Sequence, residues 1–382
     1  MALLNADNFI RTRLSLFYIA VFAAIGLGMP FWPVWLSSRG LSPADIGLTL
    51  AAGTWAKVVL NPLVGHMVDK RGDRRIPMLF LAATTSLSFI IFIFIDGFWP
   101  ILFTSMLASG LFATLLPLGE SLTMRLSMTQ KFDYARIRLW GSLSFILLAT
   151  GSGFALEGRS PEIIVFAMIG GTGLVFLACL PLPDLQRFEK KRKNLAGLGP
   201  LLKNHGFLLF MLVASLNQAS HALYYGFATL HWQSQGLADS TIGLLWAEGV
   251  IVEIGFFLIG GKILMRFGVA NLLLAATLAG ALRWTIISLD PPLIGLISVQ
   301  GLHALTFGAA HLAAMQYITH AAPTELSARA QSLYSAIVMG GAAGLAMMAA
   351  GSVYSAFHGG GFLIMAGISV LGAIASLALR RI

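Results

Sequence analysis

The chain has 382 residues, of which 57% are hydrophobic and only 11% are charged, and its mean hydropathy is +0.82. A soluble domain of this composition would expose large apolar patches, so we expect the chain to lie in a lipid bilayer. The net charge of +9 comes from basic residues that gather on one side of the predicted topology, so it does not indicate a nucleic-acid partner.

Twelve apolar segments follow one another along the chain, separated by short polar joints. A membrane-spanning helix needs about 20 apolar residues, and the segments have about that length. The pattern predicts an all-α membrane protein with twelve transmembrane helices. These run approximately over residues 14–38, 43–67, 76–95, 99–124, 136–156, 162–182, 206–234, 240–264, 270–289, 293–319, 328–354 and 360–379.

The basic residues indicate the orientation, because Lys and Arg stay preferentially in cytoplasmic loops. With both termini in the cytoplasm, the cytoplasmic segments hold 20 of the 25 Lys and Arg residues. The outer loops hold only Arg39 and Arg159, and the other three, Lys57, Arg138 and Arg283, lie within helices. We therefore expect a multi-pass protein of the cytoplasmic (inner) membrane with both termini inside.

The sequence repeats itself at an offset of 196 residues. Internal duplication in a membrane chain is typical of transporters, whose two halves move around a central site. We expect an N-terminal six-helix bundle over residues 1–183, a basic cytoplasmic linker over 184–204 and a C-terminal six-helix bundle over 205–382. The repeated glycines are Gly40, Gly53, Gly65 and Gly72, which return as Gly236, Gly249, Gly261 and Gly268.

Enzyme signatures are absent from the sequence. It contains no His-Glu-x-x-His zinc motif, no phosphate-binding P-loop and no Gly-x-Ser-x-Gly elbow. The only cysteine is Cys179, which excludes an internal disulfide and a multi-cysteine metal site. We predict no catalytic residues, no metal and no cofactor.

The joint between the second and third predicted helices reads GHMVDKRGDRR over residues 65–75. It resembles the signature loop of the major facilitator superfamily, which implies a gating role for Gly65, Asp69, Arg71 and Gly72. Gly65 would let helices approach closely, and Asp69 could pair with a charge or cap a helix N-terminus. The repeat of this loop has Met265 in place of the acid. The acidic part of the gate is therefore expected only in the N-terminal half.

Further stretches are similar to the phenylpropionate permease family, which is related to the lactose permease proton symporters. They cover residues 132–142, 221–227, 283–284 and 311–318, and so fall in both halves. The resemblance implies import of a small aromatic carboxylate, such as 3-phenylpropionate, by proton symport through alternating access. A sugar or nucleoside proton symporter and a small-molecule or drug exporter share this fold and are the alternatives.

Ionisable side chains inside the predicted helices are candidate site residues, because a charge in the membrane costs several kcal/mol unless it is paired or hydrated. Glu120 and Arg138 resemble an acid and an arginine of lactose permease that contact substrate. Arg138 could hold a carboxylate through two parallel hydrogen bonds while Glu120 orients the guanidinium. The alternative is a salt bridge that only joins two helices.

Arg283 and His303 resemble an arginine and a histidine of the proton-coupling network of lactose permease. The acid expected one turn after that histidine is Thr306 in this chain. The departure leaves Glu253, Glu120 and His303 itself as candidate proton carriers, and histidine changes charge readily near physiological pH.

Lys57 and Glu253 occupy equivalent positions in the two halves, 196 residues apart. Opposite charges at such positions could exchange partners as the halves move, which would bias an equilibrium between two conformations. Glu253 is the leading proton carrier, because it is an acid within a helix that has no adjacent base in the sequence. A fixed ion pair with Lys57 or Arg138 is the alternative.

Aromatic side chains are expected to complete a cavity for the ring of the substrate. We assign substrate contacts to Trp32, Tyr224 and Tyr225, and also to His221, for which a packing role is equally consistent with the sequence. The expected partners are a small-molecule substrate and the lipid bilayer, with the monomer as the functional unit.

Overall fold

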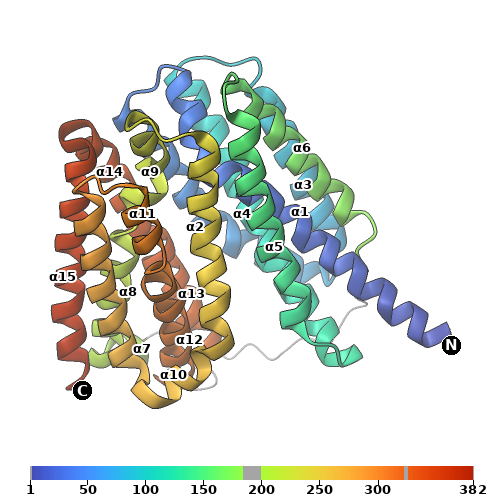
Figure 1. The fold of residues 1–382 in the computed structure, drawn as a ribbon. Helices are drawn as coiled ribbons and strands as arrows, with labels where there is room; N and C mark the ends of the chain where they lie inside the picture. Colours follow the sequence, from blue (N-terminus) through green and yellow to red (C-terminus); the bar gives the residue numbers. More distant parts are fainter. Residues whose placement is uncertain (1, 184–198, 322–325, 382) are drawn as a thin grey trace. The chain divides into compact units, whose positions relative to one another are not determined.

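The computed structural model of the chain describes residues 2–183, 199–321 and 326–381 (Figure 1). Every regular element within these ranges is a helix, so the predicted all-α class is confirmed. The helices of the N-terminal half are α1 (Ala2–Ser38), α2 (Pro43–Arg71), α3 (Arg75–Ile91), α4 (Phe98–Gln130), α5 (Tyr134–Leu156) and α6 (Glu162–Cys179).

The C-terminal half is also helical, but several of its predicted helices are interrupted. The first predicted one is divided into two, and two others contain π-helical turns, η1 and η2. The elements are α7 (Gly199–Leu202), α8 (His205–Ala219), α9 (Ala222–Ser234), α10 (Asp239–Ile287), α11 (Leu293–Gln300), η1 (Ala304–Ala309), α12 (Ala310–Ala321), α13 (Ser327–Tyr334), η2 (Ser335–Ala342), α14 (Ala343–Phe357), η3 (His358–Gly361) and α15 (Phe362–Leu379).

Eight helical stretches of the described chain are long and apolar enough to cross a membrane. Two of them, Asp239–Ile287 with 49 residues and Arg329–Leu379 with 51, are about twice as long as one crossing requires. Each contains a break, at Gly268 and at η3. Dividing both and adding α2 and α3 would give twelve crossings, and this count stays a prediction.

Four of the repeated glycines have the same backbone conformation. Gly40 and Gly72 have φ of 77° and 82°, and their repeats Gly236 and Gly268 have φ of 83° and 75°. Only glycine adopts this left-handed region without steric strain. The repeat seen in the sequence therefore preserves the turns that begin and end equivalent helices in the two halves.

The beginning and end of α2 illustrate how the sequence sets helix boundaries. Ser42 caps the helix, because its hydroxyl accepts from the Asp45 amide while the Asp45 carboxylate accepts from the Ser42 amide. Pro43 follows at the first helical position, where a missing N–H costs nothing. At the other end Gly72 donates its N–H to the carbonyl of Val68 and terminates the helix.

By the packing of its Cα atoms the chain divides into two compact units, each of which is described by itself. Unit 1 comprises Met1–Lys190 with Trp232–Ala247, and unit 2 comprises Lys191–His231 with Glu248–Ile382. The predicted domain boundaries stay a prediction, since residues 184–198 of the predicted linker lie outside the described residues.

Unit 1 is built on α1, which packs against α5 and α6, and on the pair formed by α2 and α4. Gly26 of α1 allows a close approach to the backbone of α5, because a Cβ there would lie 2.8 Å from the carbonyl oxygen of Phe145. Leu14, Phe17, Leu115 and Leu122 belong to the fully buried core between these helices.

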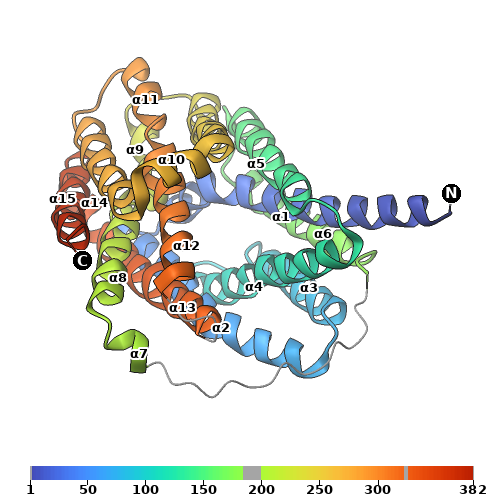
Figure 2. The same cartoon turned by 90° about the horizontal axis from the view of Figure 1, so that it is seen from below.

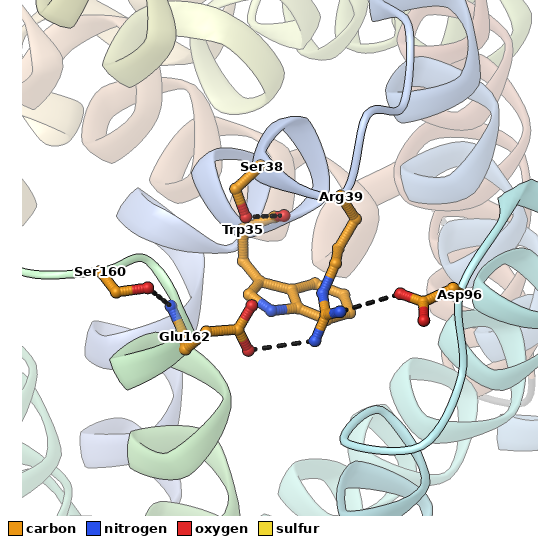
Figure 3. A network of polar contacts seen from close by, with 6 residues as sticks. All are labelled: Trp35, Ser38, Arg39, Asp96, Ser160 and Glu162. Atoms are coloured by element: carbon orange, nitrogen blue, oxygen red, sulfur yellow. Dashed lines mark hydrogen bonds and ion pairs between the residues drawn. The ribbon is translucent and has the colours of Figure 1, made fainter.

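One arginine joins three segments of unit 1 near the ends of their helices (Figure 3). Arg39, which follows α1, donates to Asp96 at 2.8 Å and to Glu162 at 3.0 Å. Asp96 lies in the joint between α3 and α4, and Glu162 is the first residue of α6. The guanidinium also lies over the ring of Trp35, 5.1 Å from its centroid. These contacts hold the predicted outer ends of unit 1 together.

Unit 2 is organised around α8, which packs against α14, α15 and η2 (Figure 2). Phe207 and Phe210 of α8 are fully buried, and the ring of Phe210 stacks on Tyr317 of α12 at 4.3 Å between centroids. Phe210 also stacks on Tyr334 of α13. This aromatic core fixes α8 against α12, and both lead directly to the polar cluster described next.

Candidate functional site

A fully buried arginine is the centre of a polar cluster in unit 2. Arg283 of α10 has no exposed surface. Its Nη1 lies 3.1 Å from Nδ1 of His303 and donates to Oγ1 of Thr306 at 3.2 Å. Its Nη2 donates to Oε1 of Gln300 at 2.6 Å. Thr306 and Gln300 present neutral acceptors, and among the described residues no carboxylate forms an ion pair with Arg283.

The π-helical turn η1 shapes this cluster. His303 directly precedes η1, and Thr306 lies inside it. A π turn is wider than an α turn and is found preferentially at functional sites. Here the Thr306 hydroxyl accepts from Arg283, and the Thr306 carbonyl accepts from Nδ2 of Asn217 at 3.0 Å. Asn217 lies near the end of α8, so η1 connects the arginine to that helix.

Aromatic rings enclose the Arg283 guanidinium. Its Cζ lies 4.5 Å from the ring centroid of Tyr224 and 4.7 Å from that of Trp284. Such contacts with the ring faces attract a cation. The Tyr224 hydroxyl also accepts from Nε2 of Gln300 at 2.9 Å. One guanidinium atom, Nε of Arg283, is buried and has no hydrogen-bond partner. The cluster therefore combines a permanent cation, aromatic walls and an unused donor.

His303 connects the arginine to an acid. A guanidinium can only donate hydrogen bonds, so Nδ1 of His303 must be the acceptor and the ring proton must lie on Nε2. That Nε2 faces Oε2 of Glu253 at 3.8 Å. His303 is therefore neutral while Arg283 donates to it. The three residues form a chain from cation through imidazole to carboxylate, and it brings together residues that the sequence predicted for proton coupling.

His221 lies beside this cluster, in a two-residue turn. Residues 220–221 separate α8 from α9, and the whole stretch His205–Ser234 is long and apolar enough for the single membrane crossing that the sequence predicted. Nδ1 of His221 lies 2.8 Å from the Asn217 carbonyl, so this nitrogen carries the proton. Its Nε2 is buried without a hydrogen-bond partner, and the ring stacks on Tyr225 at 5.6 Å. Tyr225 and His221 thus line the same cluster as Tyr224.

In unit 1 the predicted pair of Glu120 and Arg138 is present. Nε of Arg138 lies 3.9 Å from Oε1 of Glu120, and the two side chains are 27% and 38% exposed. The guanidinium also lies over the ring of Phe22, at 3.9 Å from its centroid. Arg138 is only the fifth residue of α5, near the start of that helix. Whether the pair binds substrate or only joins α4 to α5 stays a prediction.

Lys57 and Trp32 of unit 1 have different surroundings. Lys57 is partly buried in α2 and forms no ion pair with another described side chain. Its exchange of partners with Glu253 therefore stays a prediction. Trp32 stacks on Trp35 at 4.7 Å between centroids and lies edge-on to Phe92 at 4.9 Å. It belongs to an aromatic cluster between α1 and the end of α3, and its substrate contact likewise stays a prediction.

Comparison with known sequences identifies the family to which the chain belongs. The profile of the MFS_1-like family matches residues 11–363, which is most of the chain. The chain belongs to the MFS_1-like family. A protein of Escherichia coli (strain K12) named "Probable 3-phenylpropionic acid transporter" is 32% identical over 92% of this chain and 93% of its own length. The maltose permease of Geobacillus stearothermophilus is 27% identical over 97% and 95%.

Known structures agree with the MFS_1-like assignment at the level of the fold. The crystal structure of the nucleoside transporter NupG superposes with a TM-score of 0.85 at 19% identity, covering 98% of this chain and 99% of that chain. The protein is therefore a multi-pass membrane transporter of the MFS type that acts on small molecules, and it is not an enzyme. The predicted major facilitator fold is confirmed.

The gating loop of this MFS_1-like transporter is only partly described. Gly72 ends α2, whereas the side chains of Asp69 and Arg71 lie outside the described residues. At Gly65 a Cβ would meet no atom within 4 Å, so the expected close approach of helices at this glycine stays a prediction. Gly65 lines a cavity of about 160 Å³, together with the partly buried Asn61. The gating roles themselves stay predictions.

The sequence analysis did not assign three polar residues to the Arg283 cluster. Gln300, Asn217 and Thr306 each hydrogen-bond to Arg283 or to the turn that holds it. A signal for Gln300 was available, because an amide in an apolar helix three residues before His303 lies on the same helix face. For Asn217 the signal was weaker, since its carbonyl partner in η1 depends on a π turn that periodicity does not predict.

Proposed function

We propose that the protein imports a small aromatic carboxylate, of the kind represented by 3-phenylpropionate, together with a proton. The observation that carries this proposal is the Arg283 cluster. A permanently charged guanidinium lies against the rings of Tyr224 and Trp284 and connects through His303 to the acid Glu253. The cation can form charge-assisted hydrogen bonds to a carboxylate, and the aromatic side chains can pack against a ring. The buried acid can carry a proton.

The name of the Escherichia coli relative supports the same substrate class. The maltose permease and the NupG structure belong to transporters of sugars and nucleosides, which are neutral substrates. A guanidinium that no carboxylate contacts directly can form charge-assisted hydrogen bonds to both oxygens of a carboxylate substrate, which a neutral sugar or nucleoside does not offer. The cluster therefore favours the carboxylate over those alternatives, and substrates of each class are included in the test.

The proton requirement follows from electrostatics. An anion that enters a cell with a negative interior moves against the membrane potential, at about 2.3 kcal/mol per 100 mV for each charge. One accompanying proton removes this cost. Glu253 is the proposed carrier, because His303 must stay neutral while its Nδ1 accepts from Arg283. Glu120 is already paired with Arg138 and is the less favoured acid.

Transport is proposed to proceed by alternating access of the two duplicated halves, with Asp69, Arg71 and Gly72 acting at the cytoplasmic gate. Such gating requires an equilibrium between two global conformations that substrate and proton bias together. We place both termini in the cytoplasm and propose the monomer as the functional unit. The basic loops predicted on the inner side support this orientation.

The test is uptake by proteoliposomes that contain the purified protein and have an alkaline interior. Labelled 3-phenylpropionate should accumulate above its external concentration, and a protonophore should abolish the accumulation. Maltose and uridine, tested in the same vesicles, should not accumulate. Accumulation of either neutral substrate without the aromatic acid would contradict the proposal, as would proton-driven efflux of a cationic drug with no uptake of the acid.

A further inference from the structure

An aromatic carboxylate, if it is the substrate as proposed above, needs a cation that no carboxylate already contacts directly. Arg138 faces the Glu120 carboxylate at 3.9 Å, so a substrate anion there would compete with an existing anion. Arg283 forms hydrogen bonds to the side chains of His303, Thr306 and Gln300, which offer uncharged acceptors. A charge-assisted hydrogen bond is about twice as strong as a neutral one. Exchange of a neutral acceptor for a carboxylate is therefore more favourable at Arg283 than at Arg138.

Gln300 occupies the position that a carboxylate would take. Its Oε1 lies 2.6 Å from Nη2 of Arg283, which is the short distance typical of a strong acceptor. Its Nε2 donates to the Tyr224 hydroxyl, so the amide connects the cation to the aromatic wall. Nε of Arg283 is a second donor, buried and without a partner. Nε and Nη2 lie on one edge of the guanidinium and can hold both oxygens of a carboxylate.

The charge of the empty cluster has to be balanced as well. Arg283 is fully buried, and a buried cation without a counter-charge costs several kcal/mol. The acid connected to it is Glu253, which reaches it through the neutral ring of His303. An ionised Glu253 would therefore compensate Arg283 while no substrate is bound. Two anions around one buried guanidinium are unfavourable, so one of two acids in such a site keeps its proton.

We propose that Arg283 binds the substrate carboxylate in place of the Gln300 amide oxygen, and that Glu253 takes up one proton from the solvent as the carboxylate binds. The net charge of the cluster is then the same when it is empty and when it is loaded. A carboxylate without the proton, or a proton without the carboxylate, leaves the cluster with one unbalanced charge. Proton and substrate consequently bind together in a ratio of one to one.

Other titratable groups surround this exchange and are part of its test. Glu248 lies on the same helix as Glu253 and interacts electrostatically with Arg283 without forming an ion pair to it. Tyr224 and Tyr225 of α9 and His221 before it also face the guanidinium. Among these groups Glu248 is the one carboxylic acid besides Glu253. Glu248→Gln is therefore the variant that tests whether the proton goes to Glu253 or to Glu248.

The experiment measures binding of 3-phenylpropionate to the purified protein in lipid nanodiscs, by calorimetry and by a pH indicator in weakly buffered solution. Near pH 8 the wild type should take up about one proton per bound carboxylate. Its affinity should fall about tenfold for each further unit of pH, because each unit makes one required proton tenfold scarcer. The neutral analogue 3-phenylpropionamide should cause no proton uptake.

The variants separate the two parts of the proposal. Glu253→Gln should bind the acid with no proton uptake and with an affinity independent of pH, whereas Glu248→Gln and the exposed control Glu157→Gln should keep the uptake. Arg283→Lys should weaken binding at least about 30-fold, because an ammonium group cannot form the bidentate contact. Arg138→Lys and the exposed control Arg159→Lys should weaken it less than about fivefold.

The outcomes distinguish this inference from the proposed function. If the wild type neither binds nor transports the aromatic acid, the proposed function is wrong. If it binds the acid but Glu253→Gln still takes up a proton, or Arg283→Lys keeps its affinity while Arg138→Lys loses it, only the inference is overturned. Each variant is first checked for monodispersity, because a misfolded Arg283→Lys would also lose affinity. In that case the proton count of Glu253→Gln decides.

Discussion

Two arginines of this transporter lie inside predicted membrane helices, and they differ in their exposure and in the hydrogen-bond acceptors around them. Arg138 in unit 1 faces a carboxylate at 3.9 Å and is 27% exposed. Arg283 in unit 2 is fully buried and donates to His303, Thr306 and Gln300. The more deeply buried cation therefore has the weaker compensation, which is the reverse of what stability alone would favour.

The difference indicates which arginine can bind a charged substrate. A paired cation such as Arg138 contributes to holding helices together, and a ligand would have to break that pair. An arginine held by neutral groups keeps its charge available for a ligand, at a cost in stability that a functional site commonly carries. The sequence analysis assigned the carboxylate contact to Arg138, from the resemblance of the Glu120 and Arg138 pair to lactose permease, and it could not show the acceptors around Arg283.

The largest expected effect comes from removing the charge of Arg283. Arg283→Gln should reduce uptake of 3-phenylpropionate at least about 100-fold, because the charge-assisted contacts to the carboxylate are lost. Arg138→Gln should reduce it about tenfold or less, and Arg159→Gln, a loop control, should leave it unchanged. Initial rates in proteoliposomes measure all three. A larger loss for Arg138→Gln than for Arg283→Gln would reverse the comparison.

The next effect concerns coupling and not binding. Glu253→Gln imitates a permanently protonated acid, so it should abolish accumulation driven by a pH gradient. Exchange of labelled for unlabelled substrate should stay within about threefold of the wild type, since exchange requires no net proton movement. Counterflow assays in the same vesicles measure both quantities. Survival of pH-driven accumulation would move the proton to Glu120 or His303.

A smaller effect is expected at His303, where the hydrogen bond and the proton can be separated. His303→Leu leaves a donor of the buried guanidinium without an acceptor, which should lower the free energy of unfolding by about 1–3 kcal/mol. His303→Asn supplies an amide oxygen to Arg283 and should recover most of this loss. Thermal unfolding in detergent compares the two, and equal melting temperatures would show that the Nδ1 contact contributes nothing.

At the gating loop we expect a substitution to change the rate of transport without changing the affinity for the substrate. Asp69→Asn should slow transport about fivefold and leave the dissociation constant of 3-phenylpropionate within about twofold, because the loop is proposed to bias two conformations and lies outside the predicted membrane segments. Stopped-flow uptake and calorimetry on the same preparation provide the numbers. A large loss of affinity at unchanged turnover would exclude the gating role.

The smallest effect is expected at the outer ends of unit 1. Asp96→Asn removes one of the two carboxylates that bind Arg39, and the Asp96 side chain is 81% exposed. Exposed ion pairs contribute about 0.2–1 kcal/mol, and Glu162 still holds the arginine. The melting temperature should therefore fall only slightly, and a fall comparable to that of His303→Leu would show that this contact is a principal support of the fold.

Much of the fold was predictable, because composition and glycine placement are local signals. The segments predicted for the N-terminal half lie within helices α1 to α6 to within a few residues, and the repeated glycines adopt matching left-handed turns. The break at residues 220–221 and the π turns η1 and η2 were not predicted. In η1 the Thr306 carbonyl accepts from Asn217 of another helix, and no periodicity within one segment reports such a contact.

The site was predictable as a set of residues but not as an arrangement. An ionisable side chain in an apolar helix is visible in the sequence, so Arg283, His303 and Glu253 were all found. Their order, with the imidazole between the cation and the acid, depends on three segments packing together. The sequence also could not show that Gln300 and Thr306 satisfy the arginine without neutralising it, and this is the property on which the substrate assignment depends.

The central claim, that one proton accompanies one carboxylate, is tested most directly by the accumulation ratio at equilibrium. Proteoliposomes with independently clamped pH gradient and membrane potential would be loaded with labelled 3-phenylpropionate until uptake stops. The account predicts an inside-to-outside ratio that changes about tenfold for each unit of pH difference, since one proton per cycle carries about 1.4 kcal/mol per unit. It also predicts no response to the membrane potential, because the transported charges cancel. A ratio that follows the potential, or ignores the pH difference, would contradict it.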